Sequence, residues 1–428
     1  MSHIEPFRAI RYATQPAAAD ISGRIAPPYD VLDAADKKAL LDRDASNFVK
    51  IDLPYVPPKH AGPPAVYEQA AADLRQWLAQ GVMVSDSTPA IYPYYQRFTH
   101  AGREYARKKF FARLRLEPFG AGSVFPHELT FGGPKEDRLS LMKATRANLS
   151  PIFGLYEDAS NSVANRLEAA LPKNPLAYGT LDQVESRMWS VSDPAVVADV
   201  VQMMRSRPIF IADGHHRYGT SLLYRDWLRT QGEIPDNHPA NYVLTVFCAM
   251  EDPGLLILPT HRVLPGLALR ASTLQSDQNL EVTSMPSTSP EAAVRELTRF
   301  GPQAVALFSA TDNSYVAVRP RDPNLLKQWE TSHSDAWRHL GLAFLHAYLL
   351  DRVVTPQITG GKAPDIHYVK AAEPSVAEAR STNGSVFLLQ PTTMDELRAV
   401  CKAGDLMPQK STFFWPKLAS GMLVNPLT

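Results

Sequence analysis

Five consecutive residues combine a carboxylate, a glycine, two imidazoles and a guanidinium. Arg217 presents a planar fork of N–H groups that matches phosphate oxygens, and His215 and His216 can donate hydrogen bonds or protons near neutral pH. Gly214 has no side chain, so a ligand can approach the backbone closely, and Asp213 can accept a proton or bind Mg²⁺. The run predicts a phosphate-binding site in which His215 and His216 are also candidate catalytic groups.

The sequence around this run places it at the start of a helix. Residues 208–212 form a short apolar stretch typical of a buried strand, whereas Leu222, Leu223 and Trp227 have helical spacing. At a helix N-terminus the backbone N–H groups lack intrahelical partners and the helix dipole is positive, so anions bind there. The alternative is that Asp213 only caps the helix, with surface histidines behind it.

A polar segment between residues 123 and 150 supplies further candidates. Lys135 and Arg138 are candidate phosphate clamps, and Glu128 and Asp137, like Asp213, are candidate ligands of Mg²⁺ or proton acceptors. Ordered loops of this composition usually serve a site. The alternatives are that Glu128 is an ordinary loop acid or helix cap, and that Lys135 and its neighbours form the salt-bridged, solvated start of a helix.

Two other basic segments are weaker candidates. Lys410 is followed by Ser411 and Thr412 in a segment that could close on a ligand, which makes Lys410 a third candidate clamp. His261 and Arg262 follow a predicted strand, where such residues are more often structural or surface groups than catalysts.

A metal-dependent hydrolase is less favoured by the histidine pattern. The adjacent pair His215 and His216 lacks the i, i+4 spacing of a helical zinc pair, and His127 and His261 add no second spaced motif. The sequence contains neither GxxxxGK[ST] nor GxGxxG, which argues against a P-loop or a Rossmann site. A nucleotide site in this chain would therefore be of another type.

The remaining pattern predicts an α+β fold with mixed and antiparallel sheets and short helices. Residues 90–98 and 105–116 have the composition of a β-hairpin, and residues 242–250 and 255–258 flank a turn signal that predicts a second one. Residues 335–350 predict an amphipathic helix. We expect three regions, an N-terminal α+β region at 1–120, a phosphate-binding core at 121–270 and a C-terminal α+β region at 271–428.

Composition narrows the class of protein. The chain has 428 residues with 44 Lys and Arg against 44 Asp and Glu, so bulk charge does not attract it to nucleic acid or to an anionic membrane. Only Cys248 and Cys401 are present, which leaves no disulfide framework or multi-cysteine zinc site. No apolar run reaches the roughly 18 residues of a membrane span, and the N-terminal residues lack a signal core. We expect a cytoplasmic protein without a membrane partner.

Several segments together resemble one family. They are Pro6–Arg8, Ala26–Val31, Pro126–Glu128, Gly133–Arg138, Ala212–Tyr218, Pro259–Arg262 and Met407–Phe414. In this order they resemble the bacterial and archaeal family of domain of unknown function 1015, from about residue 6 to the C-terminus. The name of that family carries no chemistry.

The run from Asp213 to Arg217 also resembles the glycine-histidine-arginine signature of the ParB and sulfiredoxin superfamily, in which this turn holds nucleotide phosphates. The resemblance implies a ParB/sulfiredoxin-like nucleotide-binding core with ATP or ADP and Mg²⁺ as cofactors. Free serine kinases of that superfamily pair the turn with an upstream acidic residue that activates the substrate hydroxyl, which implies this role for Glu128. Glu128 lies 85 residues before Asp213, so the resemblance also implies an insertion.

These observations predict a phosphotransferase that moves phosphate from a nucleotide to a small hydroxylated metabolite. The resemblance implies free serine or a relative as the acceptor. One alternative is a phosphohydrolase that uses the same anion site with water as the acceptor. Another is a non-catalytic nucleotide sensor or DNA-associated regulator, although a neutral chain without a clear recognition helix disfavours a nucleic-acid partner. The sequence gives no prediction of oligomeric state.

Overall fold

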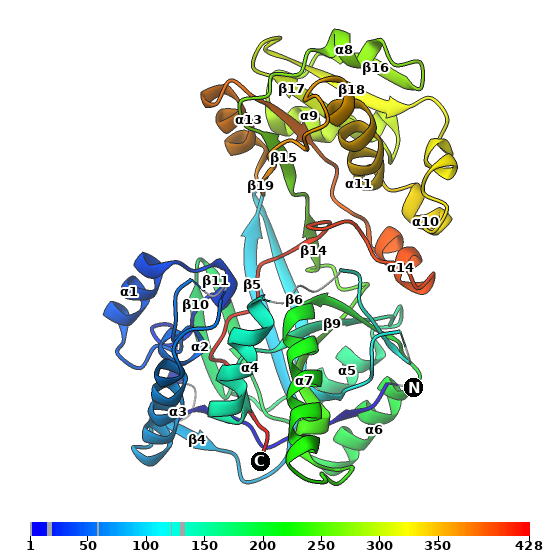
Figure 1. Ribbon diagram of the computed structural model, residues 1–428. Helices are drawn as coiled ribbons and strands as arrows, with labels where there is room; N and C mark the ends of the chain where they lie inside the picture. The colour runs from blue at the N-terminus through cyan, green and yellow to red at the C-terminus, as the bar shows by residue number, and fades with distance from the viewer. Residues whose placement is uncertain (1, 15–18, 58–59, 121, 129–132) are drawn as a thin grey trace. The chain divides into compact units, whose positions relative to one another are not determined.

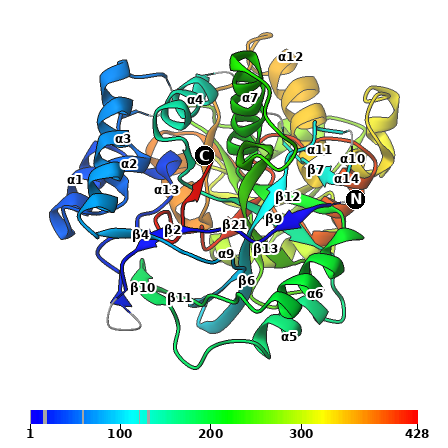
Figure 2. The same cartoon turned by 90° about the horizontal axis from the view of Figure 1, so that it is seen from below.

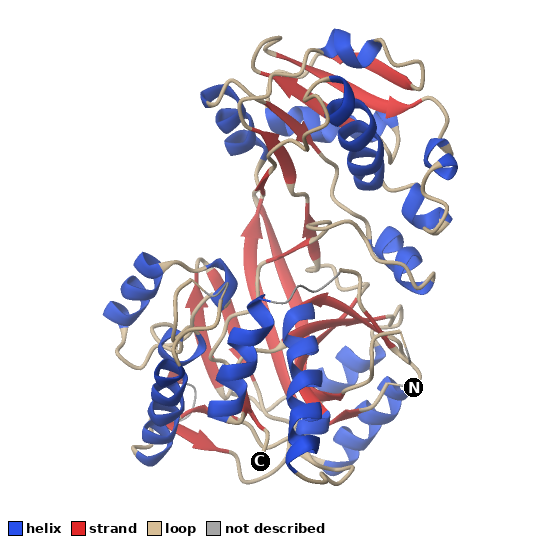
Figure 3. Cartoon of the chain, viewed as in Figure 1, coloured by secondary structure: helices blue, strands red, loops and turns tan. Residues whose placement is uncertain are grey.

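The computed structural model describes residues 2–428 except 15–18, 58–59, 121 and 129–132. The chain divides into two compact units, of which unit 1 comprises residues 1–256 and Pro416–Thr428 and unit 2 comprises Ile257–Trp415. The expected α+β class with mixed sheets is confirmed (Figure 3). The expected boundaries at residues 120 and 270 do not coincide with the two units, because strands on both sides of residue 120 form one sheet of unit 1.

Among the described residues, ten strands form the main sheet of unit 1 (Figure 1). In spatial order they are β3 (Ala19–Asp20), β10 (Ala177–Leu181), β11 (Val184–Met188), β5 (Tyr92–His100), β6 (Arg103–Arg115), β13 (Tyr242–Ala249), β9 (Ile152–Tyr156), β12 (Ile209–Asp213) and β7 (Val124–Phe125), and β1 (Ile4–Glu5) also pairs with β6. Short strands form two further pairs, β2 (Ile10–Tyr12) with β4 (Met83–Ser85) and β8 (Ala147–Asn148) with β22 (Asn425–Pro426).

Helices cover both sides of this sheet. They are α1 (Ala34–Arg43), α2 (Val49–Asp52), α3 (Pro64–Ala79), α4 (Gly133–Thr145), α5 (Ser162–Glu168), α6 (Pro194–Arg205) and α7 (His215–Gln231). Figure 2 shows α3, α4 and α7 on one side of the sheet and α5 and α6 on the other. Apolar side chains of α5, α6 and α7, such as Leu167, Met204 and Tyr218, pack into one buried cluster with Ile152 and Ile211 of the sheet.

The first predicted hairpin is confirmed. Strands β5 and β6 pair antiparallel from Tyr92 opposite Phe111 to His100 opposite Arg103. The two connecting residues, Ala101 and Gly102, both have positive φ angles. That backbone matches the twist of the flanking strands, so it closes a two-residue hairpin.

The second predicted hairpin is wrong. Strand β13 pairs with β6 on one edge and with β9 on the other, so both of its edges are occupied. The segment after the turn at Asp252 forms β14 (Leu256–Leu258), which instead pairs with β21 (Phe413–Trp415) in a separate sheet.

Unit 2 contains an antiparallel sheet with the strand order β16, β18, β17, β20, β15 and β19. The bounds of its elements are β15 (His261–Leu264), α8 (Ala271–Gln275), β16 (Leu280–Met285), α9 (Pro290–Glu296), β17 (Val305–Ser309), β18 (Ser314–Pro320), β19 (His367–Val369), α13 (Ala372–Ser381), β20 (Ser385–Leu388) and α14 (Met394–Lys402). Residues from α9 and α13 pack with apolar residues of this sheet in one buried cluster.

The predicted helix at residues 335–350 is interrupted. The chain forms α10 (Asp335–Arg338), α11 (Gly341–Ala343), a π-helical segment at Phe344–Val354 and α12 (Thr355–Gln357). Leu340 has an extended conformation, which ends the first turn. The predicted apolar face is nevertheless buried, because Trp337, Phe344, Leu345 and Tyr348 are all at most 6% exposed.

Candidate functional site

A pair of parallel strands places two of the predicted motifs at one edge of the main sheet. Strand β7 runs parallel to β12, with Val124 opposite Ile209 and Phe125 opposite Phe210. Parallel strands end at the same edge of a sheet. The residues that follow β7, which include Glu128, are therefore delivered beside the turn that follows β12.

The turn between β12 and α7 has an uncapped helix N-terminus. Gly214 is the N-cap of α7 with φ 93°, and no side chain forms a capping hydrogen bond there. A Cβ atom at Gly214 would lie 3.1 Å from Ile152 Cα and 3.1 Å from Arg217 Nε, so glycine is required by space as well as by φ. The alternative in which Asp213 caps the helix is therefore wrong. Side chains leave the amides of the first turn to a ligand or to solvent.

Two cations converge on Asp213. The ammonium of Lys417 lies 2.6 Å from Asp213 Oδ2, and the Arg217 guanidinium lies 3.4 Å from Asp213 Oδ1. Burial alone would raise the pKa of Asp213, but the charges of Lys417 and Arg217 outweigh burial and lower it. The guanidinium of Arg217 also donates a hydrogen bond to the carbonyl of Pro151. Asp213 therefore stays ionised and holds both cations at the turn.

The imidazole rings of His127 and His215 form a buried pair beside this turn. Their centroids lie 4.6 Å apart with the rings nearly perpendicular. His127 Nδ1 donates to the Ile211 carbonyl at 2.7 Å, and the His127 backbone N–H donates to His215 Nε2 at 3.2 Å. Burial, followed by the neighbouring His127, lowers the pKa of His215 well below its ordinary value. His215 is therefore neutral with Nε2 as an acceptor, which does not fit proton donation by His215 near neutral pH.

Glu128 and His216 lie close to this pair. Both side chains are half-buried. Burial lowers the pKa of His127, and the charge of Glu128 is the largest effect that opposes this shift. The Glu128 carboxylate is therefore near enough to the buried ring to act on it electrostatically.

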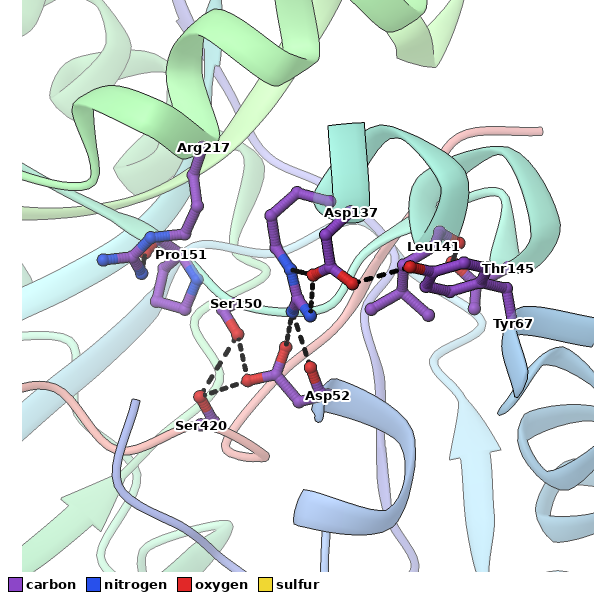
Figure 4. Close-up of polar contacts among 10 residues, drawn as sticks. Asp52, Tyr67, Asp137, Leu141, Thr145, Ser150, Pro151, Arg217 and Ser420 are labelled. Carbon is purple, nitrogen blue, oxygen red and sulfur yellow. Dashed lines mark hydrogen bonds and ion pairs between the residues drawn. The ribbon is translucent and has the colours of Figure 1, made fainter. Parts of the chain in front are cut away.

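Asp137 and Arg138 belong to a second, sealed cluster between α2, α3 and α4 (Figure 4). Arg138 lies 2.6 Å from Asp137 Oδ2, and its NH1 atom donates to the Asp52 backbone carbonyl at 2.5 Å and lies 3.5 Å from Asp52 Oδ1. Tyr67 donates its hydroxyl hydrogen to Asp137 Oδ1 at 2.7 Å. The exposed fractions of the Asp137 and Arg138 side chains are only 0% and 6%. Their polar groups are engaged inside the protein.

A small cavity of about 30 Å³ joins three of the predicted motifs. Tyr29, Arg138 and Arg217 line it together with Asp52 and Ser150. The Arg138 guanidinium lies 3.9 Å from the centre of the Tyr29 ring. Burial raises the pKa of the Tyr29 hydroxyl to about 12, so the ring is neutral. A volume of this size is enough for water and too small for a metabolite.

The two lysine candidates lie in different units. The aliphatic end of Lys135 lies against α7, because its Cε and Nζ atoms would be 3.4 and 3.7 Å from a Cβ atom at Gly219. Lys410 belongs to unit 2, where Arg262 donates hydrogen bonds to the carbonyls of Gln409 and Lys410 at 2.9 and 3.1 Å.

Arg262 and His261 serve the structure of unit 2. Arg262 is fully buried and fixes the Gln409–Lys410 backbone. His261 Nδ1 accepts a hydrogen bond from the Leu389 backbone N–H at 3.1 Å, and burial lowers the pKa of His261 to about 4.

Sequence reasoning missed two residues of these clusters, Lys417 and Asp52. Lys417 reaches Asp213 across 204 positions, and Asp52 reaches Ser150 across 98. No local pattern marks either residue, because each is defined by a partner that is distant in the sequence.

Searches for metal and membrane features returned two absences within the described ranges. Among those residues, no group of three or more His, Cys, Asp or Glu side chains is arranged to hold a metal ion. In the same part of the chain, no helix is both long and apolar enough to cross a bilayer.

Comparisons with solved structures found only distant likenesses. A free serine kinase in complex with ADP is similar at 14% identity and a TM-score of 0.34, over 68% of this chain and 84% of that chain. A conserved hypothetical protein from Pyrococcus furiosus has 14% identity and a TM-score of 0.34, over 72% of this chain and 94% of the other. SbnI from Staphylococcus aureus, truncated at its C-terminus, has 11% identity and a TM-score of 0.33, over 71% and 84%.

No curated protein matches the sequence. The sequence model of one family matches residues 4–340, which is most of the chain. The resemblance seen in the ordered motifs is thereby confirmed, and the chain belongs to the family of proteins of unknown function DUF1015.

Proposed function

We propose that this protein is a nucleotide-dependent phosphotransferase that acts on a small hydroxylated metabolite. The observation that carries the proposal is the parallel pairing of β7 with β12, which delivers Glu128 beside the uncapped N-terminus of α7. Transfer of a phosphoryl group needs donors for the phosphate oxygens and an acceptor that orients the attacking hydroxyl. The turn supplies the first and Glu128 supplies the second.

In this proposal the phosphates bind at the start of α7. The backbone at Gly214 can approach an oxygen closely, and Arg217 supplies a fork of N–H donors. Asp213 keeps Arg217 and Lys417 together at the turn. His216 is retained as a donor, whereas His215 contributes through its backbone because its ring is neutral and accepts a hydrogen bond.

The other predicted clamps are divided by their surroundings. Lys135 and Lys410 remain proposed phosphate clamps. Arg138 is left out, because it is buried and bound to Asp137 and Asp52. Asp137 is left out as an Mg²⁺ ligand for the same reason, since Arg138 and Tyr67 occupy its oxygens.

The residues of the turn fit a divalent cation when the nucleotide supplies most of the ligands. Mg²⁺ typically takes one or two carboxylates together with phosphate oxygens and water. Asp213 is ionised and about a quarter exposed, and Glu128 is the second carboxylate of this edge. When bound, Mg²⁺ would offset the charge of the phosphate oxygens.

The acceptor class decides between the candidate functions. We propose a metabolite hydroxyl, with free serine or a relative as the acceptor that the motif resemblance implies. With water as the acceptor the same site would make a phosphohydrolase, and with no acceptor it would make a nucleotide sensor.

One experiment separates these functions. Purified protein is incubated with ATP or ADP, Mg²⁺ and a pool of amino acids and small alcohols, and phosphorus NMR follows the phosphate. A new phosphate ester supports the kinase, and release of inorganic phosphate alone supports the hydrolase. Nucleotide binding without turnover supports the sensor, and absence of nucleotide binding contradicts the whole proposal.

Two substitutions test the division of labour between binding and chemistry. Arg217→Ala removes a charge-assisted hydrogen bond of about 1.5–3 kcal/mol, so we expect nucleotide affinity to fall about 10- to 150-fold. Glu128→Gln keeps the shape of the side chain but removes the charge, so we expect binding to persist and turnover to be lost. Arg217→Lys is the matched control that keeps the charge without the fork. Equal, mild effects of Arg217→Ala and Glu128→Gln would contradict these roles.

A further inference from the structure

Arg217 is connected to the sealed Asp137–Arg138 cluster through one short stretch of backbone (Figure 4). Its guanidinium donates to the carbonyl of Pro151. The preceding residue, Ser150, donates its hydroxyl hydrogen to Asp52 Oδ2 at 2.6 Å. Asp52 in turn accepts a hydrogen bond from Arg138 through its backbone carbonyl. The carbonyl that holds Arg217 is therefore one residue away from a side chain anchored on Asp52.

Asp52 joins segments that are far apart in the sequence. It lies at the end of α2, contacts Arg138 of α4, and accepts hydrogen bonds from both Ser150 and Ser420 at the same carboxylate oxygen, the latter at 2.8 Å. The two serine hydroxyls lie 3.1 Å apart. Asp52 is 3% exposed. A carboxylate in this position fixes all of these segments by charge-assisted hydrogen bonds, which are about twice as strong as neutral ones.

The direction of the Arg217 guanidinium depends on its acceptors. A long arginine side chain has many rotamers, and ordering them carries an entropic cost that a preorganised site avoids when ligand binds. Pro151 has a restricted φ angle, so the place of its carbonyl follows closely from the place of Ser150. Asp213 is the second acceptor, at 3.4 Å.

We propose that Asp52 is a positioning residue for the phosphate site, which fixes Ser150 and Pro151 and thereby aims Arg217 at the ligand. This inference rests on the proposed function only in taking the ligand to carry phosphate. Asp52 does not touch that ligand. It acts through Ser150, the Pro151 carbonyl and Arg217 in sequence.

The two serines offer a matched pair of variants. Ser150→Ala and Ser420→Ala each remove one hydroxyl from the same oxygen of Asp52, but only Ser150 is bonded in sequence to Pro151. We expect Ser150→Ala to weaken ADP binding about 3- to 10-fold, as loss of one neutral hydrogen bond would. Ser420→Ala is expected to change ADP affinity less than about twofold, with a similar shift in melting temperature. Equal losses of affinity in the two variants would overturn the proposal.

A double-substitution cycle tests whether the effect passes through Arg217. In the Arg217→Ala background, Ser150→Ala should cause no further loss of ADP affinity, because the group that it positions is absent. Additive losses would show that Ser150 acts by another route and would also overturn the proposal.

A readout without nucleotide keeps this inference separate from the proposed function. The Nε–H signal of Arg217 in nitrogen-resolved NMR should shift or broaden in Ser150→Ala and stay in place in Ser420→Ala. If wild-type protein binds no ADP but the signal behaves in this way, the positioning stands and the proposed function fails. An unchanged Arg217 signal in Ser150→Ala would sink the positioning whatever the protein binds.

Discussion

The turn after β12 and the cluster at the start of α4 use the same residue types with the opposite arrangement. In the cluster, the single cation Arg138 lies between two carboxylates, Asp137 and Asp52. At the turn, the single carboxylate Asp213 lies between two cations, Arg217 and Lys417. Side chains of the cluster are at most 6% exposed, whereas those of the turn are between 13% and 23% exposed.

The difference shows how burial and charge order separate a structural ion cluster from a candidate binding site. A buried guanidinium that bridges two carboxylates has no capacity for another anion, and its loss strands two charges. Cations gathered on a partly exposed carboxylate can turn toward an incoming phosphate at modest cost. Both arrangements contain an Asp and an Arg in one sequence motif, so the motif alone does not reveal which is which.

The largest expected effect tests the sealed cluster. Arg138→Ala leaves Asp52 and Asp137 buried without their shared cation, so we expect a loss of about 3–5 kcal/mol in the free energy of unfolding. Urea denaturation measures this loss. Arg217→Ala is the comparison variant and should cost clearly less, because its partners are closer to solvent. A cost for Arg217→Ala as large as that of Arg138→Ala would remove the distinction between the two regions.

A smaller effect is expected at the glycine of the turn. Gly214→Ala places a Cβ atom 3.1 Å from Ile152 Cα at a residue with φ 93°, so we expect a loss of about 1–3 kcal/mol in stability and weaker nucleotide binding. Gly81→Ala is a matched control, because Gly81 also has a positive φ but has nothing within 4 Å of its added Cβ. Equal melting temperatures for the two variants would mean that the close approach at Gly214 is unimportant.

The smallest effect concerns pH. The folded-state pKa of Asp213 lies below its ordinary value of 3.8, so its ion pairs stabilise the fold above about pH 4 and this contribution is lost as pH falls through the folded-state pKa. Lys417→Met removes the nearer cation, so the pKa of Asp213 should rise and the loss should begin at a higher pH. Urea denaturation between pH 3 and 6 compares the two proteins. Superimposable pH profiles would show that Lys417 does not stabilise the ionised Asp213.

Local patterns in the sequence predicted the parts of the fold that are local. The hairpin of β5 and β6 and the strand, glycine and helix around Gly214 each lie in one continuous segment, so their periodicity and turn residues are sufficient. The hairpin expected after β13 failed because distant strands occupy both edges of β13, which no pattern near residue 250 encodes. The helix expected at 335–350 failed at Leu340, whose extended backbone breaks a favourable apolar pattern.

The candidate site follows the same rule. Asp213 to Arg217 were found because their neighbours in sequence are also their neighbours in space. Pairing of β7 with β12 then bridges the 85 residues between Glu128 and Asp213. The residue that meets Asp213 is Lys417 rather than a residue of the motifs, and its identity depends on the return of the chain after unit 2.

That return of the chain has a consequence for biosynthesis. Unit 2 is one continuous stretch, whereas unit 1 needs Pro416–Thr428, which leave the ribosome after unit 2. Until then a nascent unit 1 lacks the ammonium for Asp213, one serine for Asp52 and the β22 partner of β8. Domains generally fold as units while the chain emerges, with the earlier ones first. Here the later-encoded unit can mature first, and the earlier one closes around its last strand only afterwards.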